Sequence, residues 1–135
     1  LAGLSLVARD EYDVLGGSIR YWPIRIGVAG HAALLLGSVA VYPTRQGEGL
    51  GALLINDSLH RARALGWSRV VLVGDAPYYK RFGFDRATAR TLDYPPPTNP
   101  DRLRPQALQP GAFVGVSGMV RKWDGADLVQ GRAPD

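Results

Sequence analysis

An apolar run that leads directly into a glycine-rich loop constrains this chain more than any other feature. Residues 32–42, AALLLGSVAVY, carry no charge, which is typical of a strand buried on both faces of a sheet. Gly37 interrupts the run, and a glycine inside a strand often marks a bulge or a splay where another backbone comes close. Residues 45–51, RQGEGLG, follow, and a helical pattern begins inside them. The chain must therefore pass from a buried strand to a helix through a tight loop.

This loop has the properties of an anion-binding site. The first N–H groups of a helix have no partner within the helix and lie at the positive end of its dipole. Glycines at 47, 49 and 51 remove side chains from the approach, so a pyrophosphate is the expected ligand. Two alternatives stay open on these residues alone. One is a simple connecting turn, and the other is a dinucleotide site, because Gly47-x-Gly49-x-x-Ala52 matches G-x-G-x-x-G/A.

The dinucleotide alternative is weakened by the spacing. Its first glycine should follow the strand almost immediately, yet residues 43–46 intervene, and little chain remains for a doubly wound sheet.

The rest of the pattern predicts a single α/β domain. Strands are expected at residues 4–9, 19–28, 32–42, 70–73, 87–94 and 112–123, and helices at 49–65 and 75–82. Pro23 predicts an edge or bulged second strand, and residues 95–100 a stiff extended connection. We expect a mixed, mainly antiparallel sheet with one βαβ crossover. Residues 1–123 are predicted to form the domain and 124–135 a flexible tail.

Composition narrows the class of protein further. The 135 residues include no cysteine, which excludes disulfides, thiolate metal sites and a cysteine nucleophile. No run reaches the ~18 apolar residues of a membrane span, and we expect a cytoplasmic protein without membrane contacts. The net charge is +4, but the arginines are scattered, without a basic block. This distribution argues against nucleic acid and suits either a solvated surface or a small polyanionic ligand.

Two linked motifs resemble the GNAT acetyltransferases. Residues 39–66, VAVYPTRQGEGLGALLINDSLHRARALG, resemble the cofactor-binding segment of that family, whose loop pattern is Gln/Arg-x-x-Gly-x-Gly/Ala. Gln46, Gly49 and Gly51 fill this pattern. Residues 70–84, VVLVGDAPYYKRFGF, resemble the next strand and helix, which end in Tyr-x-x-x-Gly-Phe. The YhbS-like branch is the most similar, and the resemblance is clear over residues 33–84.

The resemblance implies an acetyl-CoA-dependent N-acetyltransferase with a GNAT-like fold. The pantetheine arm would lie along the strand at residues 39–41, and amides of the loop would hold the pyrophosphate, with Arg45 adding charge. Tyr79 would protonate the departing CoA thiolate, which a phenol with a pKa near 10 can do at neutral pH. Tyr78 is its competitor, Asp75 can equally cap a helix, and Arg81 can equally be solvated. The implied cofactor-binding residues are Val39, Ala40, Val41, Arg45, Gln46, Gly47, Glu48, Gly49, Leu50, Gly51, Asp75, Tyr79 and Arg81.

The sequence also departs from the family pattern. Glu48 stands where relatives are usually basic, and residues 32–42 contain no carboxylate that could serve as a general base. Candidate bases elsewhere are Asp10, Glu11, Asp13 and His31, with deprotonation through water as the default hypothesis. A non-catalytic CoA-binding module is therefore the second hypothesis.

Three further expectations concern the surroundings of the site. The family normally begins with a strand and two helices ahead of the equivalent of Leu4, so we expect this chain to be N-terminally incomplete. The acceptor is expected to be a small-molecule or peptide amine of unknown identity. A homodimer stays open, with Val114, Val116 and Met119 as candidate contacts.

Overall fold

The computed structural model describes residues 4–9, 15–41, 49–74, 76–123, 128 and 132–134. A seven-stranded sheet forms its centre, with the strand order β5-β7-β2-β3-β4-β6 and with β1 pairing with β2. The strands are β1 (Leu4–Arg9), β2 (Leu15–Ile26), β3 (His31–Val41), β4 (Arg69–Val73), β5 (Leu92–Asp93), β6 (Leu103–Ala107) and β7 (Gly118–Lys122). The helices are α1 (Leu50–Ala64) and α2 (Ala76–Lys80), with 3₁₀ turns at Arg86–Thr88 and Pro100–Arg102.

The long strand β2 is shared between two neighbours on one side. β1 pairs with it as far as Tyr21, and β7 pairs with it from Ile24 onward. Pro23 lies between the two partners, where its missing N–H interrupts neither ladder. The edge strand predicted from Pro23 is therefore wrong, because β2 lies inside the sheet. β2 does carry an extra residue, but at Gly16, since Ala8 pairs with Gly17 and Arg9 with Leu15. The register shift between Arg20 and Tyr21 comes instead from an extra residue of β3.

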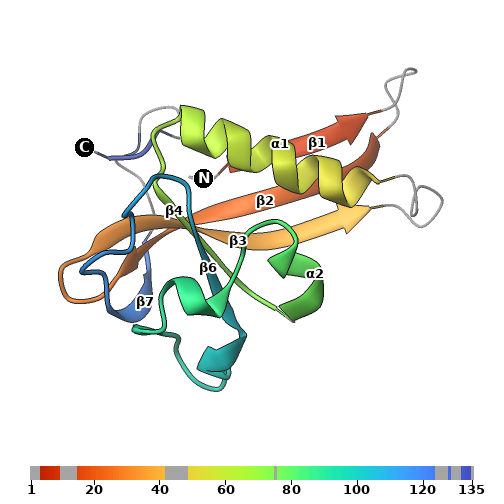
Figure 1. Ribbon diagram of the computed structural model, residues 1–135. Helices are drawn as coiled ribbons and strands as arrows, with labels where there is room; N and C mark the ends of the chain where they lie inside the picture. The colour runs from red at the N-terminus through yellow and green to blue at the C-terminus, as the bar shows by residue number, and fades with distance from the viewer. Residues whose placement is uncertain are drawn as a thin grey trace.

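The crossover from β3 through α1 to β4 is the one that the sequence predicts. β3 pairs with β2 antiparallel and with β4 parallel. Figure 1 shows α1 lying across one face of β1, β2 and β3. Gly66, with φ 92°, follows the last turn of the helix and ends it as expected. The predicted mixed and mainly antiparallel sheet is confirmed.

Two apolar cores lie on opposite faces of the sheet. The core under α1 includes Ile55, Leu59 and Trp67, and the core on the other face includes Val71 and Phe113. Leu53 of α1 is 57% exposed, so one leucine of the helix faces away from the core.

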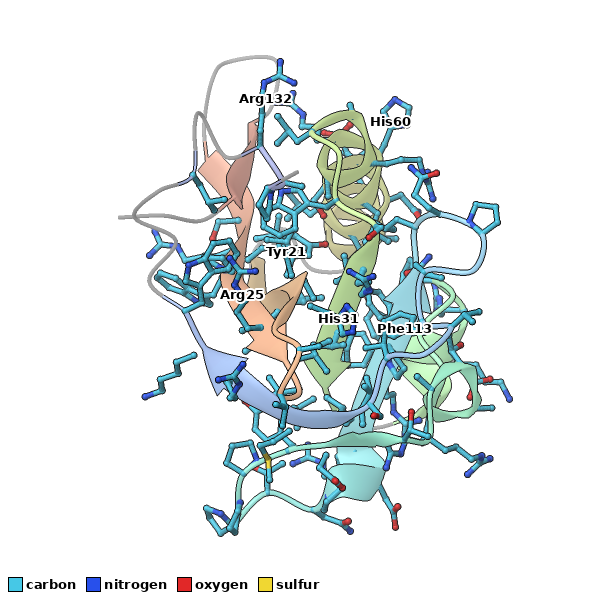
Figure 2. The ribbon with its side chains drawn as sticks, turned by 90° about the vertical axis from the view of Figure 1, so that its left-hand side faces the viewer. Tyr21, Arg25, His31, His60, Phe113 and Arg132 are labelled. Carbon is cyan, nitrogen blue, oxygen red and sulfur yellow. The ribbon has the colours of Figure 1, made fainter. Side chains whose placement is uncertain are left out.

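A buried hydrogen bond connects α1 to the sheet. Tyr21 Oη lies 2.7 Å from Ser58 Oγ, and both residues are fully buried. Ser58 Oγ donates its one hydroxyl proton to the Ile55 carbonyl at 3.0 Å, so Tyr21 is the donor to Ser58. Figure 2 shows Tyr21 between the sheet and α1, with His60 on the outer side of the helix. Burial raises the pKa of Tyr21 to about 12.

The C-terminal half differs most from the sequence prediction. The expected strand 87–94 is reduced to Leu92–Asp93, and the expected strand 112–123 to Gly118–Lys122. The predicted extended connection 95–100 contains turns and the start of a 3₁₀ turn. β6 lies in a region where the sequence predicts no strand. Val116 is only 2% exposed and therefore belongs to the core rather than to a contact surface.

The described residues of 124–135 contact the domain. Leu128 and Ala133 pack against the core under α1, and Ala133 N donates to the Leu65 carbonyl at 2.9 Å. The flexible tail stays a prediction. None of the described helices is long and apolar enough to span a bilayer.

The Tyr21 phenol predicts a pH dependence of stability. A folded-state pKa raised from 10.0 to about 12 stabilises the protein below about pH 10, and this stability is lost as the pH rises through 12. The loss is on the order of 2–3 kcal/mol in the free energy of unfolding. In Tyr21→Phe this contribution is absent, so urea unfolding between pH 10 and 12 should show a shallower decline than in the parent protein.

At neutral pH the same variant should lose about 1 kcal/mol, since Ser58 loses a hydrogen-bond partner. Tyr94→Phe, at a partly buried tyrosine on the other face, is the matched control. Equal pH slopes for Tyr21→Phe and the parent would contradict the prediction.

Candidate functional site

The pairing between β3 and β4 is unusually short. It joins only Leu34 to Val70 and Leu35 to Val71. β3 then continues to Val41 along β2, whereas β4 continues to Val73 along β6. In Figure 1 the two strands leave the centre of the sheet in different directions, β3 toward the start of α1 and β4 toward α2. At residues 38–41 the edge of β3 that faced β4 has no strand partner within the described chain, so an extended ligand can pair with it.

Gly37 is the extra residue that bends β3 at this point. Arg20 pairs with Ser38 and Tyr21 pairs with Leu36, so Gly37 is skipped in the ladder. A Cβ built on Gly37 would lie 2.6 Å from Cδ1 and Nε1 of Trp22, which no real side chain could occupy. The predicted bulge is therefore confirmed, and the ring of Trp22 lies directly against it.

The start of α1 is open to an anion. Gly49 is the N-cap, with φ 78° and ψ 11°, a left-handed conformation that favours glycine. No side chain caps this end, and the Gly49 carbonyl accepts from Leu53 N at 3.0 Å as the helix begins. Gly49 is exposed, and the backbone of Leu50 and Gly51 forms the first turn. Among the described residues, no side chain competes for the helix N–H groups that the sequence predicts as pyrophosphate ligands.

Several predicted ligands lie outside the described residues. They are Arg45, Gln46, Gly47, Glu48 and Asp75. The backbone of the other predicted ligands on this strand lies in β3. Val39, Ala40 and Val41 pair there with Ile19, Ser18 and Gly17 of β2.

The two tyrosines of α2 occupy different environments. Tyr79 is half-buried and packs against the core under α1, with its Cε2 atom so close to Gly74 that a Cβ there would lie 2.7 Å away. Tyr78 is 43% exposed and meets Tyr79 edge-on, with ring centroids 5.1 Å apart. The Arg81 guanidinium lies 5.2 Å from the Tyr78 ring centre and 5.3 Å from that of Phe82. Tyr79 is therefore the tyrosine placed at the end of β4.

Hydrogen bonds from the region of β6, a strand that the sequence does not predict, fix the end of β4. Gly74 N donates to the Arg102 carbonyl at 3.0 Å, and Arg104 Nε donates to the Gly74 carbonyl at 2.9 Å. These bonds fix the residue on which the Tyr79 ring rests. The only signal in the sequence is the alternation around Pro105, and proline argues against a central strand.

His31 is placed too far away to act as the base at the splay. It opens β3 opposite Ile26, six residues before Gly37. At ~3.3 Å per residue this is roughly 20 Å along the strand. The other candidates, Asp10, Glu11 and Asp13, lie outside the described residues.

A surface hollow of about 370 Å³ lies elsewhere, beside the edge strand β6. Its lining includes Thr88, Ala107 and Phe113. Ala107 pairs with Arg69 at the start of β4, so this hollow lies at the other end of β4 from the splay.

The contact between Gly37 and Trp22 predicts an energetic coupling. Gly37→Ala forces the indole to move and should lower the free energy of unfolding by about 1–3 kcal/mol, measured by urea denaturation. In a Trp22→Leu background the obstructing ring is gone, so the same substitution should cost at least about 1 kcal/mol less. An equal cost in both backgrounds would show that the indole does not restrict position 37.

Comparison with known proteins agrees with the resemblance found in the sequence. A family model described as an acetyltransferase (GNAT) domain matches residues 2–86. YhbS of Escherichia coli K12, described as an uncharacterized N-acetyltransferase, is 28% identical over 117 residues, which are 87% of this chain and 70% of YhbS. YjhQ of the same organism is 38% identical over 63 residues, which are 47% of this chain and 34% of YjhQ.

Solved structures agree with the sequence comparison. The crystal structure of E. coli YhbS in complex with CoA superposes with a TM-score of 0.81 at 27% identity, over 93% of this chain and 69% of that one. A GNAT family acetyltransferase from Brucella melitensis in complex with acetyl-CoA gives a TM-score of 0.67 at 34% identity, over 89% of this chain and 66% of that one. The dinucleotide alternative is wrong, because β6 runs antiparallel to β4 in a sheet that is not doubly wound. The chain belongs to the GNAT acetyltransferase family.

Proposed function

We propose that this chain transfers an acetyl group from acetyl-CoA to an amine by direct attack. The observation that carries the proposal is the splay between β3 and β4 beside an uncapped helix start. The YhbS and Brucella relatives were solved with CoA and acetyl-CoA, which supports the same cosubstrate here.

The cosubstrate is proposed to lie along the free edge of β3. Its pantetheine amides would pair with the backbone of residues 39–41 as an added strand. Its pyrophosphate would lie at Gly49, Leu50 and Gly51, where the helix dipole and free N–H groups favour negative charge. Residues 45–48 would complete the phosphate loop, with Arg45 adding positive charge. Contacts from Asp75 and Arg81 stay predictions.

The thioester would then lie near the bulge at Gly37. The amine nitrogen attacks the carbonyl carbon, and a backbone N–H near Val39 polarises the carbonyl oxygen. The C–S bond breaks, the thiolate takes a proton from Tyr79, and the new amide nitrogen loses a proton to water. Most of the acceleration is expected to come from holding the amine and the thioester together.

A non-catalytic CoA-binding module is the second candidate. The absence of any carboxylate in residues 32–42 favours it, since no base stands on the central strand. Turnover measured with a panel of amines separates the two candidates.

Thermal unfolding tests the cosubstrate. Acetyl-CoA or CoA at about 100 times its Kd should stabilise the folded state by about 2.7 kcal/mol and raise Tm accordingly. NAD and NADP at the same concentrations are matched controls and should leave Tm unchanged. Stabilisation by the dinucleotides and none by CoA would overturn the proposal.

Tyr79→Phe tests the proton donor. Removing the phenol should lower kcat by about 10²-fold with little change in the KM for acetyl-CoA, because the hydroxyl acts on the leaving group. Tyr78→Phe, which alters the exposed neighbour, is the control and should retain full kcat. An unaltered kcat in Tyr79→Phe would remove Tyr79 from the mechanism.

The surroundings of the reaction are also part of the proposal. The acceptor is a small-molecule or peptide amine, and the reaction is placed in the cytoplasm. Val114 is 84% exposed and Met119 is 41% exposed, so both remain available as contacts in a homodimer.

A further inference from the structure

Arg20 and Trp22 lie at the splay on the face of the sheet away from α1. Tyr21 points toward α1, where it meets Ser58. Because successive side chains of a strand point to opposite faces, its two neighbours point to the other face. This is the side from which an acceptor can reach a thioester held between the strands while the cosubstrate occupies the start of α1.

The two side chains form a continuous contact from the bulge outward. The Trp22 ring lies against Gly37, within 2.6 Å of where a Cβ would stand. The Arg20 guanidinium lies 5.3 Å from the Trp22 ring centre, in the range of a cation–π contact. Trp22 is half-buried and Arg20 is exposed. A positive charge is therefore held about one indole width from the point where β3 leaves β4.

Nothing in the described part of the chain neutralises this charge. The ion pairs found there join Arg61 to Asp57 and Lys80 to Asp85, both away from β2. In the strand register, the backbone of Arg20 pairs with Ser5 of β1 and with Ser38 of β3, directly beside the skipped Gly37. A guanidinium steadied on an aromatic ring, with its N–H groups open to solvent, is suited to bind a carboxylate or a phosphate.

We propose that Arg20 and Trp22 form the acceptor subsite, and that the acceptor is an amine that also carries an anionic group. The amine reaches the thioester at the splay, its carbon chain lies on the Trp22 ring, and its carboxylate or phosphate binds Arg20. This inference rests on the proposed acetyl transfer and names the acceptor class for it. Polycationic amines are accordingly poor acceptors.

Matched pairs of amines test the charge requirement. The probes are 4-aminobutyrate against its amide and 2-aminoethyl phosphate against 2-aminoethanol, with kcat/KM measured from CoA release. In at least one pair, kcat/KM should be about tenfold higher for the anionic amine than for its neutral counterpart. The pair with the larger preference identifies carboxylate or phosphate as the group recognised.

Substitutions at position 20 connect this preference to the arginine. Arg20→Gln should abolish it by raising the acceptor KM, with kcat and the KM for acetyl-CoA unchanged, and Arg20→Lys should retain part of it. Trp22→Leu should raise the KM of both members of a pair, because the ring contacts the shared carbon chain. Arg90→Gln, an exposed arginine between the 3₁₀ turn at Arg86–Thr88 and β5, is the control and should behave like the parent. Equal kcat/KM within both pairs, or a preference that survives Arg20→Gln, would overturn the proposal.

Calorimetric binding separates failure of the subsite from failure of the proposed function. Each amine is titrated into the free protein and into the CoA-bound protein, so no turnover is needed. If CoA does not bind, the proposed acetyl transfer is contradicted. The subsite is still supported if the anionic amines bind more tightly than the neutral ones and Arg20→Gln removes this difference. If CoA binds and the anionic members bind no better than the neutral ones in either form, the subsite fails and the transferase remains.

Discussion

The early end of the β3–β4 pairing is the constraint on which the rest of the site depends. Two parallel strands normally continue together, and here they separate after two residue pairs. On one side Gly37 adds a residue to β3 and turns it along β2. On the other side the backbone of Gly74 is tied through both its N–H and its carbonyl to residues of the β6 side. Each strand is therefore held by a partner other than its parallel neighbour, β3 by β2 and β4 by the β6 side. The separation of β3 from β4 is thus part of the folded state.

The arginine content of the chain follows largely from its many strand ends and turns. The guanidinium groups of several arginines donate to main-chain carbonyls in turns and near strand ends: Arg25, Arg63, Arg69, Arg86, Arg104 and Arg121. Arg69 bridges the Ala32 and Ala112 carbonyls, and burial lowers its pKa. A guanidinium suits this role because its N–H groups diverge in a fixed plane. Six of the 14 arginines therefore serve main-chain carbonyls, whereas the exposed Arg20 has its described contact with the Trp22 ring.

The sequence predicts the parts of the fold that local patterns determine. The apolar run, the glycine loop and the helical pattern that begins inside it place β3, α1 and β4 within a few residues. β6 is missed because Pro105 opposes a strand, and the pairing with β4 that overrides it is not local. The strands expected at 87–94 and 112–123 are too long, because apolar residues there fill the core on the face away from α1 instead of extending the sheet. The place of Trp22 against Gly37 depends on cross-strand register, which no periodicity reveals.

The start of α1, where the pyrophosphate is proposed to bind, is positioned by contacts further along the helix. Tyr21 holds the middle of α1 through Ser58, and Arg63 Nε holds the end of the helix by donating to the Leu108 carbonyl at 2.9 Å. A helix attached at these two points has little freedom to shift, so its start at Gly49 stays beside the end of β3 (Figure 1). β3 in turn is held to β2 as far as Val41. The end of β3 and the start of α1 are therefore each fixed by contacts with the rest of the fold. If the start of α1 binds the proposed pyrophosphate, little ordering entropy is lost on binding, because the helix groups that carry the dipole are already in place.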